Sequence, residues 1–116
     1  MNQEKLMIQR NRIRQLIEIS NRHKNVLKWS PNESDAHIQM KLEICKSLRR
    51  RGIEFYTEAI FTNRISRADI VNADEGIIYE VYDTEKKESI EKKKLIYPLP
   101  IITVKANQEF KEALIL

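Results

Sequence analysis

The sequence has little of what disulfide-bonded, secreted or membrane proteins need. A single cysteine, Cys45, excludes an internal disulfide and a cysteine-rich zinc site. There is no run of about 20 apolar residues, which a membrane-spanning helix requires. The charged N-terminal stretch lacks the apolar centre of a signal peptide. We therefore expect an intracellular protein with no membrane partner.

Glycine and proline are also scarce, with two and three residues among 116. A chain of this length supports one domain with a modest core. We expect a helical extension over residues 1–30 and a compact domain over residues 31–116. Neither charge sign dominates, because 21 Lys and Arg face 17 Asp and Glu. The small basic excess is weak evidence for nucleic acid by itself, so the two triple-basic clusters, at Arg49, Arg50 and Arg51 and at Lys92, Lys93 and Lys94, are more informative.

Apolar periodicity and turn residues predict an α/β order of elements. The second helix is expected to begin at Ser30 or Ser34, since either can cap it, and to stop at Gly52. Hairpin-linked strands followed by a helical crossover predict a mixed sheet with helices on its faces. The expected helices cover residues 3–28, about 34–51, 84–97 (capped by Thr84) and 107–116 (capped by Asn107), and the expected strands cover 53–61, 67–73, 77–83 and 101–106.

The second helix carries two adjacent stripes. One is apolar and expected to be buried, with the members Ile38, Leu42, Cys45 and Leu48. It makes Cys45 a small core residue rather than a nucleophile. The other stripe contains His37, Lys41 and Ile44, each one turn from the next.

Two acids interrupt the most strand-like segments. Asp69 lies in "RADIV" and Glu80 in "IIYEVYD", where an uncompensated buried charge is costly. A two-residue turn at Glu75 and Gly76 would place Asp69 opposite Tyr82 and diagonal to Glu80. A four-residue loop also keeps both acids on one face, whereas a three-residue loop separates them unless a bulge intervenes.

Two carboxylates on one face raise each other's pKa, and a divalent cation relieves this repulsion. Oxygen ligands from Asp, Glu and a backbone carbonyl suit Mg²⁺ or Mn²⁺. The structural alternative is that each acid pairs with a basic neighbour, for example Asp69 with Arg64 or Arg67.

Residues 34–104 resemble the PD-(D/E)xK superfamily of restriction-endonuclease-like nucleases. The resemblance rests on the αβββαβ element order, on "RADIV" as the first acid site and on "YEV" followed by Tyr82 as the second. It implies that Asp69, Glu80 and the carbonyl of Val81 hold the metal. Where the superfamily has Lys this chain has Tyr82, so the positive charge is expected from His37 and Lys41 on the first core helix. The superfamily's helical acid would correspond to Glu43 or Glu33.

The resemblance implies metal-dependent hydrolysis of DNA phosphodiester bonds. We expect the substrate to be branched, nicked or single-stranded DNA ends. Lys41, with His37, would stabilise the developing charge and Tyr82 would shape the site. Phosphate contacts are expected from both triple-basic clusters and from Arg64 and Arg67. The N-terminal helix is expected to pack on the domain, with a DNA contact or a homodimer seam as alternatives.

Two other functions stay open. The first is a nuclease-like domain that has lost catalysis and still binds nucleic acid, which Tyr82 favours. The second is an interaction or assembly protein whose acids are salt-bridged.

Overall fold

The computed structural model of the chain describes residues 1–84 and 87–116. Within these residues a four-stranded sheet is accompanied by three α-helices and two short 3₁₀ helices. The elements in chain order are α1 (Gln3–Arg14), η1 (Ile19–Asn21), α2 (Asp35–Arg50), β1 (Phe55–Ile60), β2 (Arg67–Asn72), β3 (Ile77–Tyr82), α3 (Lys87–Ile96), β4 (Ile101–Lys105) and η2 (Glu112–Leu114). None of the helices in the described residues has the length and apolar character that a membrane span needs.

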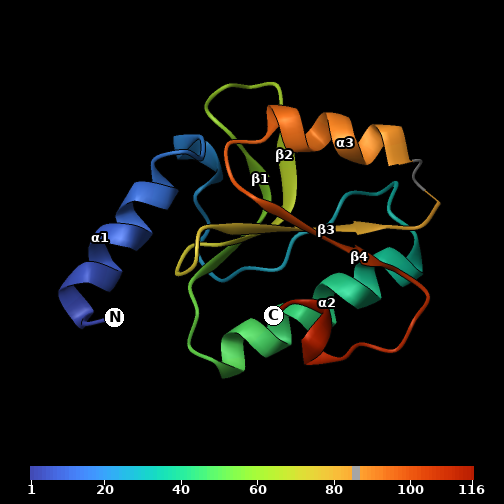
Figure 1. Ribbon diagram of the computed structural model, residues 1–116, viewed down its shortest axis with the longest axis horizontal. Helices are drawn as coiled ribbons and strands as arrows, with labels where there is room; N and C mark the ends of the chain where they lie inside the picture. Colours follow the sequence, from blue (N-terminus) through green and yellow to red (C-terminus); the bar gives the residue numbers. More distant parts are fainter. Residues whose placement is uncertain (85–86) are drawn as a thin grey trace.

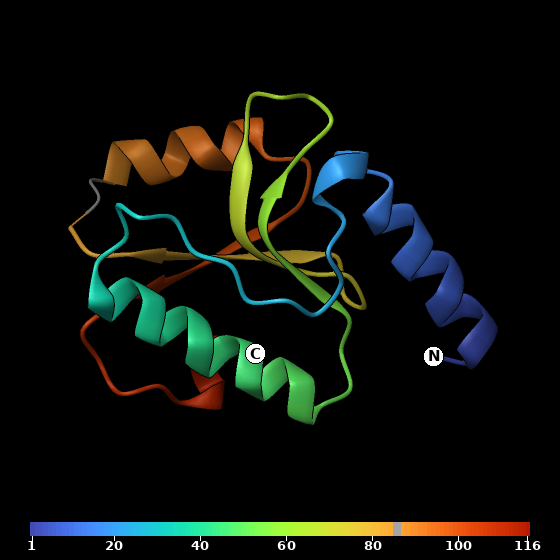
Figure 2. The same ribbon diagram turned by 180° about the vertical axis from the view of Figure 1, so that it is seen from behind.

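The sheet is mixed and its strands follow chain order, β1-β2-β3-β4. The first two pairings are antiparallel and the β3–β4 pairing is parallel. A parallel neighbour needs a crossover, and α3 supplies it. Helices α2 and α3 lie on opposite sides of β3 and β4, and η2 lies beside α2 (Figures 1 and 2). The predicted α/β class and mixed sheet are confirmed.

The β2–β3 hairpin has a longer loop than the preferred two-residue turn. Asn72 pairs with Ile77, so residues 73–76 form a four-residue loop, and Gly76 takes a φ of 68° there. The prediction that Asp69 lies opposite Tyr82 is therefore wrong. The four-residue alternative applies, and the register of Ile70 with Tyr79 carries Asp69 to the position facing Glu80.

Two apolar clusters fill the two sides of the sheet. One joins Leu48 and its neighbours on α2 to Phe55, Tyr79 and Val104 of the sheet. The other joins Ile13 of α1 to Tyr56 and Val71, with Leu99 packed against it. Helix α1 is held further by Arg10, whose Nε lies 2.7 Å from Asp74 Oδ1, so its C-terminal half packs on the domain as expected.

The N-terminal helix is shorter than predicted and ends at Arg14. The chain that follows runs along the open edge of β1 instead. Asn25 N donates to Phe55 O at 2.8 Å, and Lys28 N donates to Thr57 Oγ1 at 2.8 Å. Pairing of an exposed strand edge has outweighed local helix propensity.

Helix α2 begins at Asp35 because Ser34 caps it, accepting from His37 N at 3.1 Å. Ser30 does not start a helix, although Glu33 Oε2 reaches back to Ser30 N at 2.7 Å as in a capping box. The buried face of α2 is rotated from the predicted stripe. Cys45 and Leu48 are buried as expected, but Met40, Lys41, Ile44 and Ser47 are buried in place of Ile38 and Leu42.

The C-terminal helix predicted from Asn107 is absent from the described chain, and only the short η2 forms. Asn107 adopts a φ of 60° rather than a capping conformation. Ile115 is buried against the α2 side of the sheet, so tertiary packing fixes this segment. For α3, residues 85–86 of the predicted helix, and with them its expected start after Thr84, lie outside the described residues.

Candidate functional site

A polar cavity of about 340 Å³ opens where β2 and β3 separate beyond their last ladder pair. Carboxylates converge on it from the segment before α2, from β1, from β2 and from β3. Basic and aromatic side chains close it from β2 and α3. The residues lining it are Ser30, Glu33, His37, Glu58, Arg67, Asp69, Glu80, Val81, Tyr82, Asp83, Lys93 and Tyr97.

The side chains of Asp69 and Glu80 form hydrogen bonds between β2 and β3 beyond the last backbone pair of the two strands. The backbone N–H of Asp69 donates to Glu80 Oε2 at 3.1 Å. The backbone N–H of Val81 donates to Asp69 Oδ2 at 2.8 Å. The strands can therefore separate without leaving these two donors unsatisfied. Both acids line the same cavity, as the sequence predicted for the four-residue loop.

The two acids differ strongly in proton affinity. Burial, followed by the negative charge of Asp69 and a hydrogen bond with it, raises the pKa of Glu80 to about 9. Burial alone would raise the pKa of Asp69 as well, but hydrogen bonds with His37, Glu80 and Val81 outweigh burial and lower it. The pair thus holds one proton near neutral pH, on the Glu80 side.

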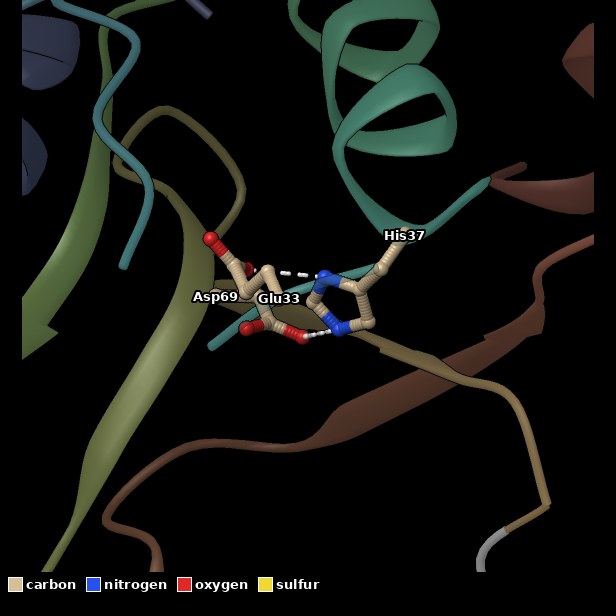
Figure 3. Close-up of side chains that lie close together, drawn as sticks. All are labelled: Glu33, His37 and Asp69. Atoms are coloured by element: carbon tan, nitrogen blue, oxygen red, sulfur yellow. Dashed lines mark ion pairs between the residues drawn. The ribbon is translucent and has the colours of Figure 1, made fainter. Parts of the chain in front are cut away.

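His37 enters the cavity from the first turn of α2 and lies between two acids (Figure 3). Its Nε2 lies 2.8 Å from Val81 O and 3.4 Å from Asp69 Oδ2. A carbonyl can only accept, so Nε2 carries a proton. Its Nδ1 lies 2.8 Å from Glu33 Oε1 but without the alignment of a hydrogen bond. Burial acts to lower the pKa of His37, but Asp69, Glu33 and Val81 outweigh it and raise the pKa.

Glu33, His37 and Asp69 form a second set of potential ligands. One ligand atom from each lies within 4.8 Å of the others. This set shares Asp69 with the predicted set of Asp69, Glu80 and Val81. Asp69 and Glu33 favour the charged form of His37 and raise its pKa, so that form would place positive charge beside the acids.

Lys41 is fully buried and does not line the cavity as the described residues form it. Its Nζ donates to Lys28 O at 2.8 Å, Glu58 Oε1 at 2.9 Å and Glu33 Oε1 at 3.0 Å. These three acceptors use all three ammonium hydrogens. Lys41 therefore holds the carboxylates of Glu33 and Glu58 from the protein interior. The prediction that it faces the substrate is not met by this position.

Glu58 is held in a strained backbone conformation. Its φ is 48°, which is unfavourable for a residue with a Cβ and costs about 1 kcal/mol or more. It lies between the ladder pairs Thr57–Ile70 and Ala59–Ala68, beside Asp69. In this conformation the Glu58 carboxylate contacts both Lys41 and Arg67, and Arg67 Nε lies 3.2 Å from Glu58 Oε2.

The alternative in which Asp69 forms a salt bridge with Arg64 or Arg67 is wrong, because both arginines pair with other acids. Arg67 pairs with Glu58, and Arg64 pairs with Glu18 at 2.8 Å. The partners of Asp69 among the described residues are His37, Glu80 and the Val81 backbone.

Of the basic residues expected to contact DNA, two line the cavity: Arg67 and Lys93. Arg49 and Arg50 are exposed at the end of α2, and Arg51 follows it with its Nη2 3.0 Å from Glu75 Oε1. Lys92 is exposed on α3, and Lys94 Nζ lies 3.5 Å from Glu91 Oε1. Of the helical acids, Glu33 enters the cavity, whereas Glu43 pairs with Lys46 on the surface.

Four residues line the cavity without having been predicted as site residues: Ser30, Glu58, Asp83 and Tyr97. Glu58 had a usable signal, since a charged residue interrupts the alternating apolar pattern of "IEFYTEAIF". Tyr97 had none, because it follows α3 and reaches the cavity only through the crossover. Its hydroxyl donates to Arg67 O at 2.8 Å.

Comparisons with protein-family models, with curated proteins and with solved structures find no match. The site combines a proton-sharing acid pair, a histidine whose ring nitrogens lie 2.8 Å from Glu33 and 3.4 Å from Asp69, and two basic side chains in the cavity lining.

Proposed function

We propose that this protein is a metal-dependent nuclease that hydrolyses DNA phosphodiester bonds, a divergent member of the PD-(D/E)xK superfamily. The observation that carries the proposal is the convergence of Asp69 and Glu80 on one cavity, with the pKa of Glu80 raised to about 9. Perturbed carboxylate pairs in clefts are typical of functional sites. The αβββαβ order of elements supports it as well.

The donor set fits Mg²⁺ or Mn²⁺. Asp69 and Glu80 offer hard oxygen ligands. A third oxygen is the carbonyl of Val81, the residue whose N–H donates to Asp69 and whose carbonyl contacts His37. Val81 O accepts from His37 Nε2, so it becomes a ligand only if that hydrogen bond is given up. Glu33 offers a further carboxylate oxygen beside Asp69, and His37 would join the set only after it loses a proton. When bound, such an ion supplies an activated water and stabilises negative charge on the phosphate.

Positive charge toward the scissile phosphate is assigned to Arg67 and Lys93. Both line the cavity, whereas Lys41 lies behind it and Tyr82 stands where the superfamily has Lys. Tyr82 is half-buried at the cavity wall, where its ring shapes the space. Lys41 acts as a positioning residue through Glu33 and Glu58.

His37 orients the acids. Its Nε2–H is bound to Val81 O and lies near Asp69, so it fixes the end of β3 against α2. Arg64, Lys92 and Lys94 would extend the rim charge and contact phosphates without reading sequence.

The test is a cleavage assay on plasmid, single-stranded and four-way-junction DNA with Mg²⁺ or Mn²⁺. Asp69→Asn and Glu80→Gln should abolish cutting. Glu91→Gln is the matched control, because Glu91 is a surface acid 57% exposed beside Lys94. Cleavage by all variants alike would overturn the proposed site.

A second function, DNA binding without catalysis, is favoured by one observation. The ammonium of Lys41 is enclosed by protein acceptors, so the cation expected from α2 does not face the cavity. DNA binding that weakens steeply with salt, with no cleavage by wild type in either metal, would establish this function. Absence of DNA binding would leave the acids with a structural role.

A further inference from the structure

Trp29 is an exposed aromatic residue beside the acid cavity. It is the only tryptophan in the chain, and 56% of it is exposed. Indole rings are usually well buried, and exposed ones are enriched where proteins bind ligands. Trp29 precedes α2 by a few residues, in the segment that runs along β1.

The backbone on both sides of Trp29 is anchored. Lys28 N donates to Thr57 Oγ1 at 2.8 Å, and Lys28 O accepts from the buried Lys41 at 2.8 Å. On the other side, Ser30 N donates to Glu33 Oε2 at 2.7 Å. Fixed backbone positions restrict where the indole can lie, so its exposed face is presented at low entropic cost.

The space around Trp29 adjoins the acid cavity. A groove of about 230 Å³ is lined by Trp29, Lys28, Asn21 and Ile60, and also by Ser30, Glu58 and Arg67. The last three residues line the acid cavity too, so the two spaces meet there. A polymer that occupied both would pass from the aromatic groove to the acids.

The charge of the groove complements a phosphate chain. Lys28 and Arg67 line it against one carboxylate, that of Glu58, so the lining carries a net positive charge. The Arg67 side chain is 59% exposed, and the Lys28 ammonium lies 3.1 Å from His23 Nδ1. Arg67 pairs with Glu58 through Nε, which is one of the three nitrogens of its guanidinium group. Two cations beside an indole match the combination of phosphate contacts and base stacking found in single-strand binding sites.

We infer that Trp29 stacks on an unpaired base while Lys28 and Arg67 contact the adjoining phosphates, so that the strand leading to Asp69 and Glu80 is single-stranded. Bases within a duplex are covered on both faces by their neighbours, so they offer no face to the indole. The inference rests on the proposed function for the link to cleavage, but the stacking is independent of catalysis.

The experiment uses the intrinsic fluorescence of Trp29. Glu80→Gln protein in EDTA is titrated with oligothymidylate, so that nothing is cut, and in parallel with oligouridylate and a blunt duplex. Stacking predicts saturable quenching by the single strands and much less by the duplex. The two single-stranded arms separate a DNA from an RNA ligand. Saturated binding of oligothymidylate without a change in emission would overturn the inference.

Variants test the contact by anisotropy of labelled oligothymidylate. Trp29→Ala should weaken single-strand binding about tenfold, within the range for one base–aromatic stack, and leave duplex binding unchanged. Trp29→Phe should retain most of the affinity. Leu95→Ala, an 87% exposed apolar residue on α3, is the control for loss of surface apolar area. Equal affinities of Trp29→Ala and wild type would overturn the inference.

Lys28→Met tests the phosphate contact. The slope of log affinity against log salt should become shallower by about 0.7, the contribution of one phosphate contact in a single strand. Quenching without cleavage in the metal assay would leave the stacking site standing and the nuclease proposal refuted. Cleavage by wild type without quenching would refute the stacking site and leave the nuclease proposal standing.

Discussion

The side chain of Glu80 accepts a hydrogen bond from the backbone N–H of Asp69 at 3.1 Å through Oε2, so one acid of the hairpin holds the main chain of the other. The return contact runs from Val81 N to Asp69 Oδ2 at 2.8 Å. These bonds replace the ladder where β2 and β3 part. The acids are therefore structural partners of the strand ends as well as candidate ligands, and isosteric amide variants are the appropriate probes.

The first prediction is that stability falls as pH rises above about 5. The pKa of Glu80 is about 9 in the folded protein against an ordinary value of 4.5, so the folded state keeps a proton that the unfolded chain releases. The stabilisation is complete below the unfolded pKa and is lost as pH rises toward 9. We expect a loss of several kcal/mol between about pH 5 and about pH 9, since one pKa unit is worth about 1.4 kcal/mol. Urea unfolding at several pH values measures it.

Glu80→Gln should flatten this dependence, and Glu91→Gln should not. The raised pKa of His37 acts in the same direction, because its contribution is also lost with rising pH, so a smaller slope remains in Glu80→Gln. The lowered pKa of Asp69 acts oppositely, but only as pH falls below its unfolded value near 3.8. A wild-type curve that is level over this range would contradict the prediction.

The second prediction is that Mn²⁺ binding releases protons. A carboxylate must be ionised to hold a cation, so Glu80 has to give up its proton. Calorimetry at neutral pH in buffers of different ionisation enthalpy should show release of about one proton per ion, and affinity should rise with pH. Asp69→Asn and Glu80→Gln should each weaken binding at least tenfold. Binding with no proton release would argue against Glu80 as a ligand.

Local sequence patterns were sufficient for most of the fold. Alternation in "RADIV" and "IIYEVYD", with Gly76 where the chain needs positive φ, located the β2–β3 hairpin and its two acids. Runs of apolar residues and capping signals located α2 and β4. These patterns work because each reflects contacts within a few residues along the chain.

The rest of the site depends on contacts between distant segments. The sequence places Lys41 in a helical stripe with His37 and Ile44. Its burial depends on Glu58, whose left-handed backbone has no local signal such as glycine. The segment around Asn25 is helical in composition, yet it pairs with the edge of β1. Neither outcome is visible until the strand order is known.

The third prediction concerns Lys41. Lys41→Met would remove the ammonium from between Glu33 and Glu58 and leave two carboxylates without their buried partner. We expect a loss of about 3–5 kcal/mol in the free energy of unfolding. The emission of Trp29 should also change, because Lys41 anchors the carbonyl of Lys28. Urea unfolding and fluorescence spectra measure the two effects.

Lys46→Met is the matched control for this loss. Lys46 lies on the same helix, 42% exposed and 3.6 Å from Glu43, where an ion pair contributes little. Its unfolding free energy should stay within about 0.5 kcal/mol of wild type. Equal stabilities of the two variants would show that the buried network does not hold the site.

The fourth prediction concerns Lys93, a basic residue that lines the acid cavity, and it rests on the proposed nuclease function. Lys93 lines the cavity from α3, and its charge acts to lower the pKa of Glu80. If Lys93 stabilises charge on the phosphate, Lys93→Met should reduce kcat about 10²- to 10³-fold and change KM little. Lys93→Arg should restore part of the rate. Lys105→Met, an exposed lysine on β4, should leave kcat unchanged.

A readout without DNA separates this role from a general loss of structure. Removal of the Lys93 charge should move the pKa of Glu80 further upward, because the largest effects on it, burial and the charge of Asp69, would then be less opposed. A carbon-detected NMR titration of the Glu80 carboxyl group measures this in wild type and Lys93→Met. If the pKa rises but kcat is unaffected, Lys93 tunes the acid pair without contacting the phosphate, and Arg67 remains as the cation at the cavity.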